Sequence, residues 1–177
     1  MNISFNLDGA IRKIPDFPKA GILFYDLSSI LTNPAAYAFC IDRMKELYID
    51  SGYDAVAAIE ARGFLFAAPF ALAAGLPLIM VRKKGKLPGE TIGKKFALEY
   101  GEDEVEIHVH DIPSGGNILI VDDLIATGGT IKAAADLFVE GGANTVEIFS
   151  VVGLPFLGYE NELHDFTVTT LINYASE

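Results

Sequence analysis

One continuous run, residues 118–130, constrains the fold more than any other segment: it reads Ile-Leu-Ile-Val-Asp-Asp-Leu-Ile-Ala-Thr-Gly-Gly-Thr. Its first four residues are apolar and predict a buried strand, which ends at two adjacent carboxylates, Asp122 and Asp123, at an exposed strand end. A turn of small residues, 126–130, then opens a helix predicted to begin near Ile131. The N–H groups of such a turn and the helix dipole bind phosphate, and carboxylates accept hydrogen bonds from sugar hydroxyls. The run therefore predicts a strand–turn–helix unit that holds a phosphorylated sugar.

Strand and helix patterns alternate along most of the chain. Helices are predicted at 34–51, 64–74 and 131–140, and strands at 54–59, 78–81, 105–109, 118–121, 146–152 and 167–171. Continuous apolar strands separated by helices form a parallel sheet with both faces covered. Ligands of such sheets bind beyond the carboxyl ends of the strands, where Asp122 and Arg62 both fall. Residues 1–32 break the alternation and are predicted to be irregular, forming a small cap over the edge of the sheet.

Composition limits the classes of protein. The 177 residues suit one domain, and the longest apolar stretch, residues 64–80, is interrupted by Pro and Gly and is too short for a membrane span. The net charge of −11 argues against nucleic-acid binding, whose footprint is basic. A single cysteine, Cys40, excludes an internal disulfide and fits a reducing cytoplasm. Five of the 13 Lys and Arg residues lie at Arg62 and within 82–86, a local positive patch that can attract phosphates.

The sequence lacks the elements of two other phosphate-binding patterns. An Asp-Asp pair after a strand can bind magnesium through a nucleotide, but that site requires an upstream Gly-x-x-x-x-Gly-Lys-Ser/Thr loop, which the sequence lacks. The dinucleotide fingerprint Gly-x-Gly-x-x-Gly is also absent from the sequence. The phosphorylated-sugar interpretation is therefore the one that the residues favour.

The motif Val121–Thr130 resembles the phosphoribosyl pyrophosphate motif of the type I phosphoribosyltransferases. Its Ala-Thr-Gly-Gly-Thr form is similar to that of the adenine-specific members, and the likeness runs from residue 14 to about residue 154. The resemblance implies an α/β fold: a central, mainly parallel twisted sheet with helices on both faces. It further implies a single domain over 1–177, with an N-terminal hood at 1–32 and a flexible catalytic flap at 82–110.

The resemblance also assigns roles around the phosphoribosyl group. It places the sugar phosphate, and AMP as product, on Asp122, Asp123, Ala126, Thr127, Gly128, Gly129 and Thr130. The turn 60–63 reads, by itself, as an ordinary strand–helix connection with a surface Arg. In the family it corresponds to the pyrophosphate loop, with Arg62 as a ligand and a non-proline cis peptide expected near Glu60 and Ala61.

Residues 82–103 are polar, basic and rich in Gly and Pro, which is typical of a lid or a disordered segment. By resemblance Lys83 and Lys86 contact pyrophosphate, Glu99 is the catalytic acid/base near adenine N7, and Tyr100 covers the ribose. From the residues alone, Glu99 reads as a solvated carboxylate on a hairpin.

The base pocket is the least specific part of the interpretation. By resemblance, Phe24 and Leu154 lie against the two faces of adenine, and the backbone N–H and C=O of Leu23 read its N1 and 6-amino group. From the residues alone, Phe24 and Leu154 read as core. Tyr25 stands where family members commonly have Arg, and Ala20 where they commonly have Pro.

The activity implied is transfer of 5-phosphoribosyl from phosphoribosyl pyrophosphate to adenine, giving AMP and pyrophosphate, a pentosyl transfer of purine salvage. Magnesium is expected on the substrate's own oxygens, with no metal site made by the protein alone, and a homodimer is expected from the family. Two alternatives remain: a phosphoribosyltransferase for hypoxanthine or xanthine, and a non-catalytic regulator that senses phosphoribosyl pyrophosphate. The acidic charge disfavours the regulator.

Overall fold

The computed structural model describes residues 5–97 and 101–176. Their helices are α1 (Ser28–Leu31), α2 (Pro34–Tyr48), α3 (Gly63–Ala74), α4 (Gly129–Glu140) and α5 (Tyr159–Glu162), with short 3₁₀ turns η1 (Asp8–Ala10), η2 (Val109–Asp111) and η3 (Pro155–Leu157). The strands are β1 (Arg12–Pro15), β2 (Leu23–Asp26), β3 (Ala55–Ile59), β4 (Leu78–Lys83), β5 (Thr91–Ala97), β6 (Glu102–His108), β7 (Asn117–Ile125), β8 (Thr145–Gly153) and β9 (Thr167–Asn173).

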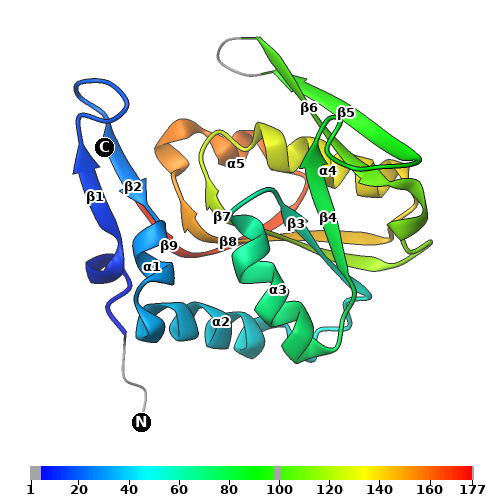
Figure 1. Ribbon diagram of the computed structural model, residues 1–177, viewed down its shortest axis with the longest axis horizontal. Coiled ribbons are helices and arrows are strands. Elements are labelled where there is room, and N and C mark those ends of the chain that lie inside the picture. The colour runs from blue at the N-terminus through cyan, green and yellow to red at the C-terminus, as the bar shows by residue number, and fades with distance from the viewer. Residues whose placement is uncertain (1–4, 98–100, 177) are drawn as a thin grey trace.

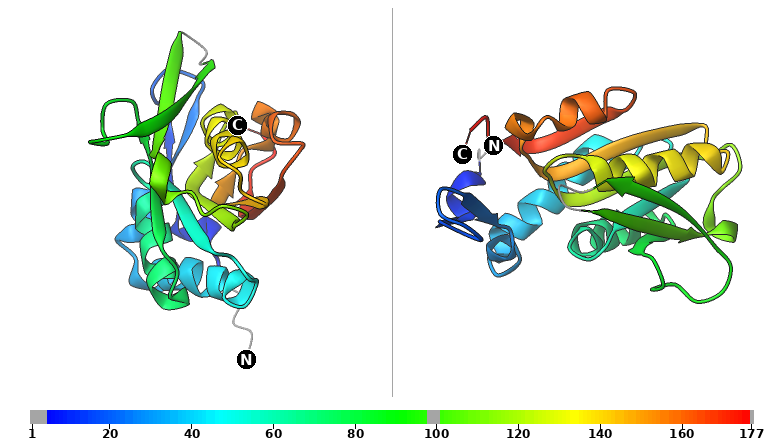
Figure 2. Two further views of the ribbon diagram at one scale, coloured as in Figure 1. Left: turned by 90° about the vertical axis from the view of Figure 1, so that its right-hand side faces the viewer. Right: turned by 90° about the horizontal axis from the view of Figure 1, so that it is seen from above.

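Seven strands form one sheet in the order β5-β6-β4-β3-β7-β8-β9. The five strands from β4 to β9 pair in parallel, and the β5–β6 hairpin adds two antiparallel strands at one edge. Helices α2 and α3 cover one face of the sheet, and α4 and α5 cover the other (Figures 1 and 2). The predicted α/β architecture, with a mainly parallel sheet between two helical layers, is confirmed.

The sheet is parallel because its central strands are buried on both faces. All five residues of β3 are buried, as are Ile118 to Val121 of β7. Alternate residues of these strands enter two separate cores: Val56 and Ala58 pack with α2 and α3, while Ala55 and Ala57 pack with the layer of α4. Such strands can be stable only with helices on both sides. No helix among the described residues is long and apolar enough to cross a membrane.

Three local predictions were wrong. β7 does not end at the Asp pair but continues to Ile125, because β8 keeps pairing alongside it. α4 begins at Gly129, two residues before the predicted start. Within residues 1–32, which were predicted to be irregular, β1 and β2 form a two-stranded antiparallel sheet, because the Pro and Gly breakers fall mostly in the connection between them.

Strand β6 is more buried than its sequence pattern indicates. Glu106 alternates with the apolar residues Val105 and Ile107, a pattern typical of a half-exposed strand, yet all three residues are buried. The Glu106 carboxylate is buried because the loop between β4 and β5 folds over it, and the N–H groups of Lys86 and Leu87 donate to it at 3.0 and 2.9 Å.

Candidate active site

A cleft of about 590 Å³ lies at the carboxyl ends of β3, β4 and β7, beside the β5–β6 hairpin. It brings together segments from four parts of the sequence. Its polar lining residues are Glu60, Arg62, Lys83, Asp103, Asp122, Asp123 and Thr130. Five of these, Arg62, Lys83, Asp122, Asp123 and Thr130, were predicted from the sequence to belong to one site.

The sequence predicted that the two aspartates of β7 lie at an exposed strand end, and this prediction was wrong. Asp123 is only 3% exposed, and Asp122 is half-buried, with its Oδ1 accepting the N–H of Asp123 at 2.8 Å. Burial raises the pKa of the Asp122 carboxyl well above its usual value, and the neighbouring charge of Asp123 raises it further. The pair is therefore enclosed by the fold and presents a short acidic wall to the cleft.

Arg62 is the direct partner of this acidic wall. Its Nε donates to Oδ2 of Asp123 at 2.5 Å, while about half of the Arg62 side chain stays exposed. The contact forms because β3 and β7 are neighbouring parallel strands, so the residues that follow them meet at one edge of the sheet. The cation predicted for pyrophosphate thus lies against the carboxylate predicted for ribose.

The turn that carries Arg62 has two distinctive backbone features, a cis peptide bond and a glycine in close contact with β7. The Glu60–Ala61 peptide bond is cis, as predicted from the resemblance. A Cβ at position 63 would lie 2.8 Å from the carbonyl oxygen of Val121 and 3.1 Å from the Asp122 carboxylate. Only glycine at this position allows α3 to begin so close to β7.

A second, smaller hollow of about 110 Å³ follows the Asp pair. It is lined by Asp122 and by residues 124–131, which include the whole turn Ala126-Thr127-Gly128-Gly129-Thr130. Gly128 has φ of +89°, a left-handed conformation that glycine adopts readily, and α4 starts at the next residue. The first N–H groups of a helix have no partner within the helix, so this hollow presents donors suited to an anion.

The basic segment is also held by carboxylates. Lys83 pairs with Asp103 at 2.7 Å across the cleft, and this hydrogen bond raises the pKa of Lys83. Glu60 accepts Nε of Arg82 at 2.9 Å and the N–H of Lys83 at 3.0 Å. The Lys86 side chain is exposed on the loop between β4 and β5, and Lys86 is not among the residues that line the cleft. The other two flap predictions, Glu99 and Tyr100, lie outside the described residues.

The residues predicted for the base lie on two elements. Leu154, directly after β8, is buried, and its N–H donates to Ile125 at 2.9 Å. Leu23 is half-buried and packs on the same core as Leu154. Phe24 is half-buried on β2, with its ring edge-to-face against Phe17 at 5.1 Å.

Two carboxylates that hold basic residues, Glu60 and Asp103, were not predicted as site residues. Glu60 is the first residue of the predicted turn, and Asp103 faces Lys83 because β6 pairs antiparallel with β4. The available signal was the density of acidic residues at 102–106 beside a basic segment, but their pairing required the register of the hairpin.

Comparisons with known proteins agree with this geometry. Residues 26–176 match the phosphoribosyl transferase domain family. Two adenine phosphoribosyltransferases are similar: that of Treponema denticola, 58% identical over 97% of this chain and 90% of the relative, and that of Yersinia enterocolitica, 48% identical over 94% and 90%.

Two crystal structures of adenine phosphoribosyltransferases superpose closely. The enzyme of Thermoanaerobacter pseudethanolicus gives a TM-score of 0.88 at 41% identity, covering 95% of this chain and 98% of the other. The Saccharomyces cerevisiae enzyme, crystallised with an imino-altritol bisphosphate and adenine, gives 0.87 at 40% identity, covering 94% and 96%.

Proposed function

The chain belongs to the phosphoribosyl transferase family, and we propose that its cleft transfers the 5-phosphoribosyl group of phosphoribosyl pyrophosphate to adenine, forming AMP and pyrophosphate. The observation that carries this function is the contact of Arg62 with Asp123 beside the turn 126–130. It joins a cation for pyrophosphate, carboxylates for ribose and N–H donors for a phosphate in one place. The protein is therefore a glycosyltransferase of purine salvage.

The sugar phosphate occupies the hollow at the start of α4 in this proposal. Backbone N–H groups of Ala126 to Thr130 and the hydroxyl of Thr127 would donate to the 5′-phosphate. Asp122 and Asp123 would accept the ribose hydroxyls and offset positive charge that develops on the sugar as the bond to pyrophosphate breaks. Support comes from the continuity of the lining, since Asp122 and Thr130 border both hollows.

Pyrophosphate is assigned to Arg62, Lys83 and Lys86. Arg62 and Lys83 both line the cleft and are each held by a carboxylate, so their charges are oriented before substrate arrives. Lys86 would act from the loop between β4 and β5. A positioned cation lowers the barrier by stabilising the departing pyrophosphate.

Magnesium fits this cleft by donor type. Asp103, Asp122 and Asp123 supply oxygen atoms, the ligands that Mg²⁺ prefers, and a phosphoribosyl pyrophosphate molecule would bring further oxygens. When bound, the ion neutralises charge on the pyrophosphate group. We propose that it arrives on the substrate and meets this acidic wall.

Adenine is assigned to the space between Phe24 and Leu154. Leu23 stands opposite Pro15 in the β1–β2 pair, and Pro15 has no N–H to donate to the carbonyl of Leu23. That carbonyl is suited to accept the 6-amino group of adenine. Hypoxanthine carries an oxygen there and would leave the acceptor unpaired, which is a strong basis for discrimination.

The catalytic flap, residues 82–110, is proposed to complete the site. Glu99 would exchange a proton at adenine N7, and Tyr100 would cover the reacting ribose and exclude water. With the hood at 1–32, the flap would form part of one domain over 1–177.

A homodimer is proposed from an apolar surface on α3 and β4. Leu72 is 86% exposed and Leu65 44%, and Leu78 and Met80 of β4 are 37% and 42% exposed. Leu78 and Met80 pair with Val56 and Ala58, which face the α3 layer, so the four apolar side chains lie on the same side of the sheet. A second copy would cover this surface. Light scattering would show a dimer that Leu72→Lys converts to monomer, and a monomeric parent protein would contradict the proposal.

A cytoplasmic location is also proposed. Cys40 is a fully buried free thiol on α2, and burial raises its pKa to about 12. A buried, protonated thiol in a chain with one cysteine is compatible with a reducing compartment.

The function is tested with a panel of bases. Adenine, guanine, hypoxanthine and xanthine are each incubated with phosphoribosyl pyrophosphate and Mg²⁺, and pyrophosphate release is measured. We expect adenine to be used and Arg62→Gln to reduce kcat/KM about tenfold to a hundredfold, since a hydrogen bond to a charged group contributes ~1.5–3 kcal/mol. Arg43→Gln, an exposed α2 arginine paired with Glu46, is the matched control and should act like the parent. Preference for another base, or binding of phosphoribosyl pyrophosphate without turnover, would support the alternatives instead.

A further inference from the structure

Tyr174, directly after β9, joins two parts of the molecule that are far apart in sequence. Its backbone N–H donates to the carbonyl of Gly153 at 3.0 Å. Its ring stacks on Tyr25 of β2, with 4.0 Å between the ring centroids and 16° between the planes. Its hydroxyl donates to Asp8 at 2.6 Å, and Nζ of Lys13 lies 5.2 Å from its ring centroid.

These contacts lie one residue away from both halves of the proposed base site. Gly153 directly precedes Leu154, and Tyr25 directly follows Phe24. Tyr25 is buried, and successive residues of a strand point to opposite sides, so Phe24 faces away from Tyr174. Phe24 and Asp26 therefore share the side of β2 opposite to the one that Tyr174 supports.

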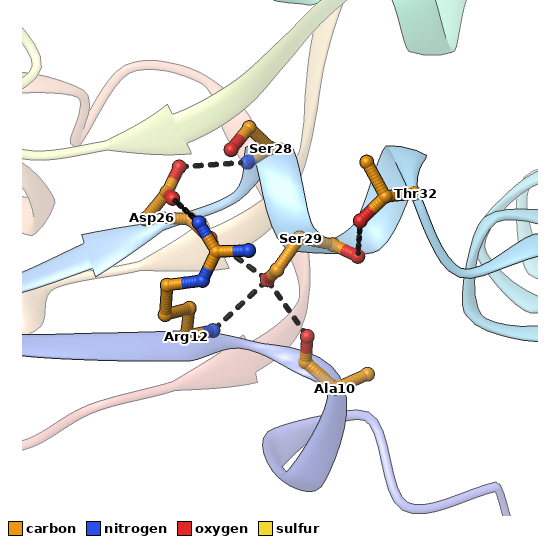
Figure 3. A network of polar contacts seen from close by, with 6 residues as sticks. All are labelled: Ala10, Arg12, Asp26, Ser28, Ser29 and Thr32. Atoms are coloured by element: carbon orange, nitrogen blue, oxygen red, sulfur yellow. Dashed lines mark hydrogen bonds and ion pairs between the residues drawn. The ribbon is translucent and has the colours of Figure 1, made fainter.

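The β1–β2 hairpin has a second attachment at its base (Figure 3). The hydroxyl of Ser29 on α1 accepts the N–H of Arg12 at 2.9 Å and lies 2.8 Å from the carbonyl of Ala10. Asp26 accepts from Arg12 Nη1 and from the N–H of Ser28, both at 3.0 Å. This network ties the base of the hairpin to α1, and the Tyr25–Tyr174 stack ties β2 to the end of β9.

We propose that Tyr174 is a positioning residue for the base: it sets the separation between Phe24 and Leu154 and so the affinity for adenine. It does this by binding the end of β8 with its backbone while its ring supports β2. The inference rests on the proposed function, because it takes Phe24 and Leu154 as the two sides of the adenine site.

The test separates positioning from general stability by comparing two substrates. Tyr174→Leu removes the stack and the hydroxyl, and we expect the KM for adenine to rise about threefold to tenfold, the range that an aromatic pair contributes. The KM for phosphoribosyl pyrophosphate should stay within about twofold. Tyr174→Phe keeps the ring and should restore the KM for adenine.

Tyr53→Leu is the matched control. Tyr53 is also half-buried, contacts another tyrosine ring (Tyr48, 5.8 Å) and donates to a carboxylate, that of Glu147, but it lies just before β3, at the opposite end of the sheet from the cleft. Its loss should leave both KM values unchanged even where it lowers the unfolding temperature. If Tyr174→Leu folds poorly, Tyr174→Met takes its place in the same assay, because it keeps apolar contact without a ring stack.

Equal changes of both KM values in Tyr174→Leu, or a change in unfolding temperature with no change in the KM for adenine, would overturn the positioning role. An inactive parent protein would instead contradict the proposed function. The two failures are distinguishable because the parent is assayed first.

Discussion

Replacing Glu106 tests how the fold holds the basic loop beside the cleft. The carboxylate is 6% exposed, and its Oε1 accepts the N–H groups of both Lys86 and Leu87, while Oε2 lies 3.4 Å from the hydroxyl of Thr91. The hydrogen bond from the Leu87 N–H contributes most to lowering the pKa of Glu106, and further hydrogen bonds add to this effect. Glu106 thereby fixes the path of the chain from β4 to β5.

The magnitude follows from these two backbone bonds. Glu106→Gln keeps an amide oxygen that can accept both N–H groups, but the bonds become neutral. A hydrogen bond to a charged group contributes ~1.5–3 kcal/mol and a neutral one ~0.5–1.5 kcal/mol, so the variant should lose roughly 2 kcal/mol of unfolding free energy. For a chain of this size that corresponds to about 4–8 °C in the unfolding temperature.

The loss should depend on pH in a defined direction. Because the pKa of Glu106 is lower in the folded protein than its ordinary 4.5, its stabilisation is fully present above about pH 4.5 and disappears as the pH falls through the lowered value. Urea unfolding of parent and variant at pH 7 should show the full difference, and the difference should shrink near pH 3. The KM for phosphoribosyl pyrophosphate should rise, because the same loop carries Lys86.

Glu104→Gln is the control, since Glu104 lies on the same strand and its carboxylate pairs with the exposed Lys84 at 2.8 Å. It should leave the unfolding free energy unchanged within error. If Glu106→Gln matches the parent at pH 7, or if its deficit persists undiminished at pH 3, then the charged hydrogen bonds do not hold this loop.

Three further substitutions address the chemistry. Asp122→Asn should lower kcat/KM for phosphoribosyl pyrophosphate about tenfold to a hundredfold. Because burial raises the pKa of Asp122, its negative charge destabilises the folded protein above the ordinary carboxyl pKa. Removing that charge should therefore leave the unfolding temperature at pH 7 no lower than in the parent. Thr127→Val should weaken AMP binding in calorimetry without changing the unfolding temperature; unchanged affinity with a looser fold would make Thr127 a structural residue. Glu99→Gln should slow kcat about 10²–10⁴-fold while AMP and phosphoribosyl pyrophosphate still bind, and a variant at full speed would remove Glu99 from proton transfer.

The sequence predicted the layers of the fold because the central strands are apolar on every residue. Runs such as Ile118–Val121 exclude a half-exposed sheet, and the intervening helices dictate parallel pairing. The local sequence pattern gave the wrong strand boundary where pairing with a distant strand determines where the strand ends. Two carboxylates look like the end of a strand, yet β8 pairs past them to Gly153 and extends β7 to Ile125.

Polar residues that the fold encloses were the main source of error at the site. Glu106 alternates with apolar neighbours and so reads as solvent-facing, but a loop from β4 covers it. The nearness of Arg62 and Asp123 could be anticipated, because both follow neighbouring parallel strands. Their direct ion pair could not, since it depends on the turn geometry around Glu60 and Gly63.

The ion pairs also explain how a protein of net charge −11 can bind a polyanion. Arg62 is held by Asp123, Arg82 by Glu60 and Lys83 by Asp103, so each of these basic residues has a carboxylate neighbour. The carboxylates relieve repulsion among cations that converge on one cleft, and they fix side chains that would otherwise lose conformational freedom on binding. A pyrophosphate group entering beside them gains oriented donors, but it must compete with the acidic partners for those donors. We therefore expect binding beside Asp122 and Asp123 to require extra positive charge from Mg²⁺.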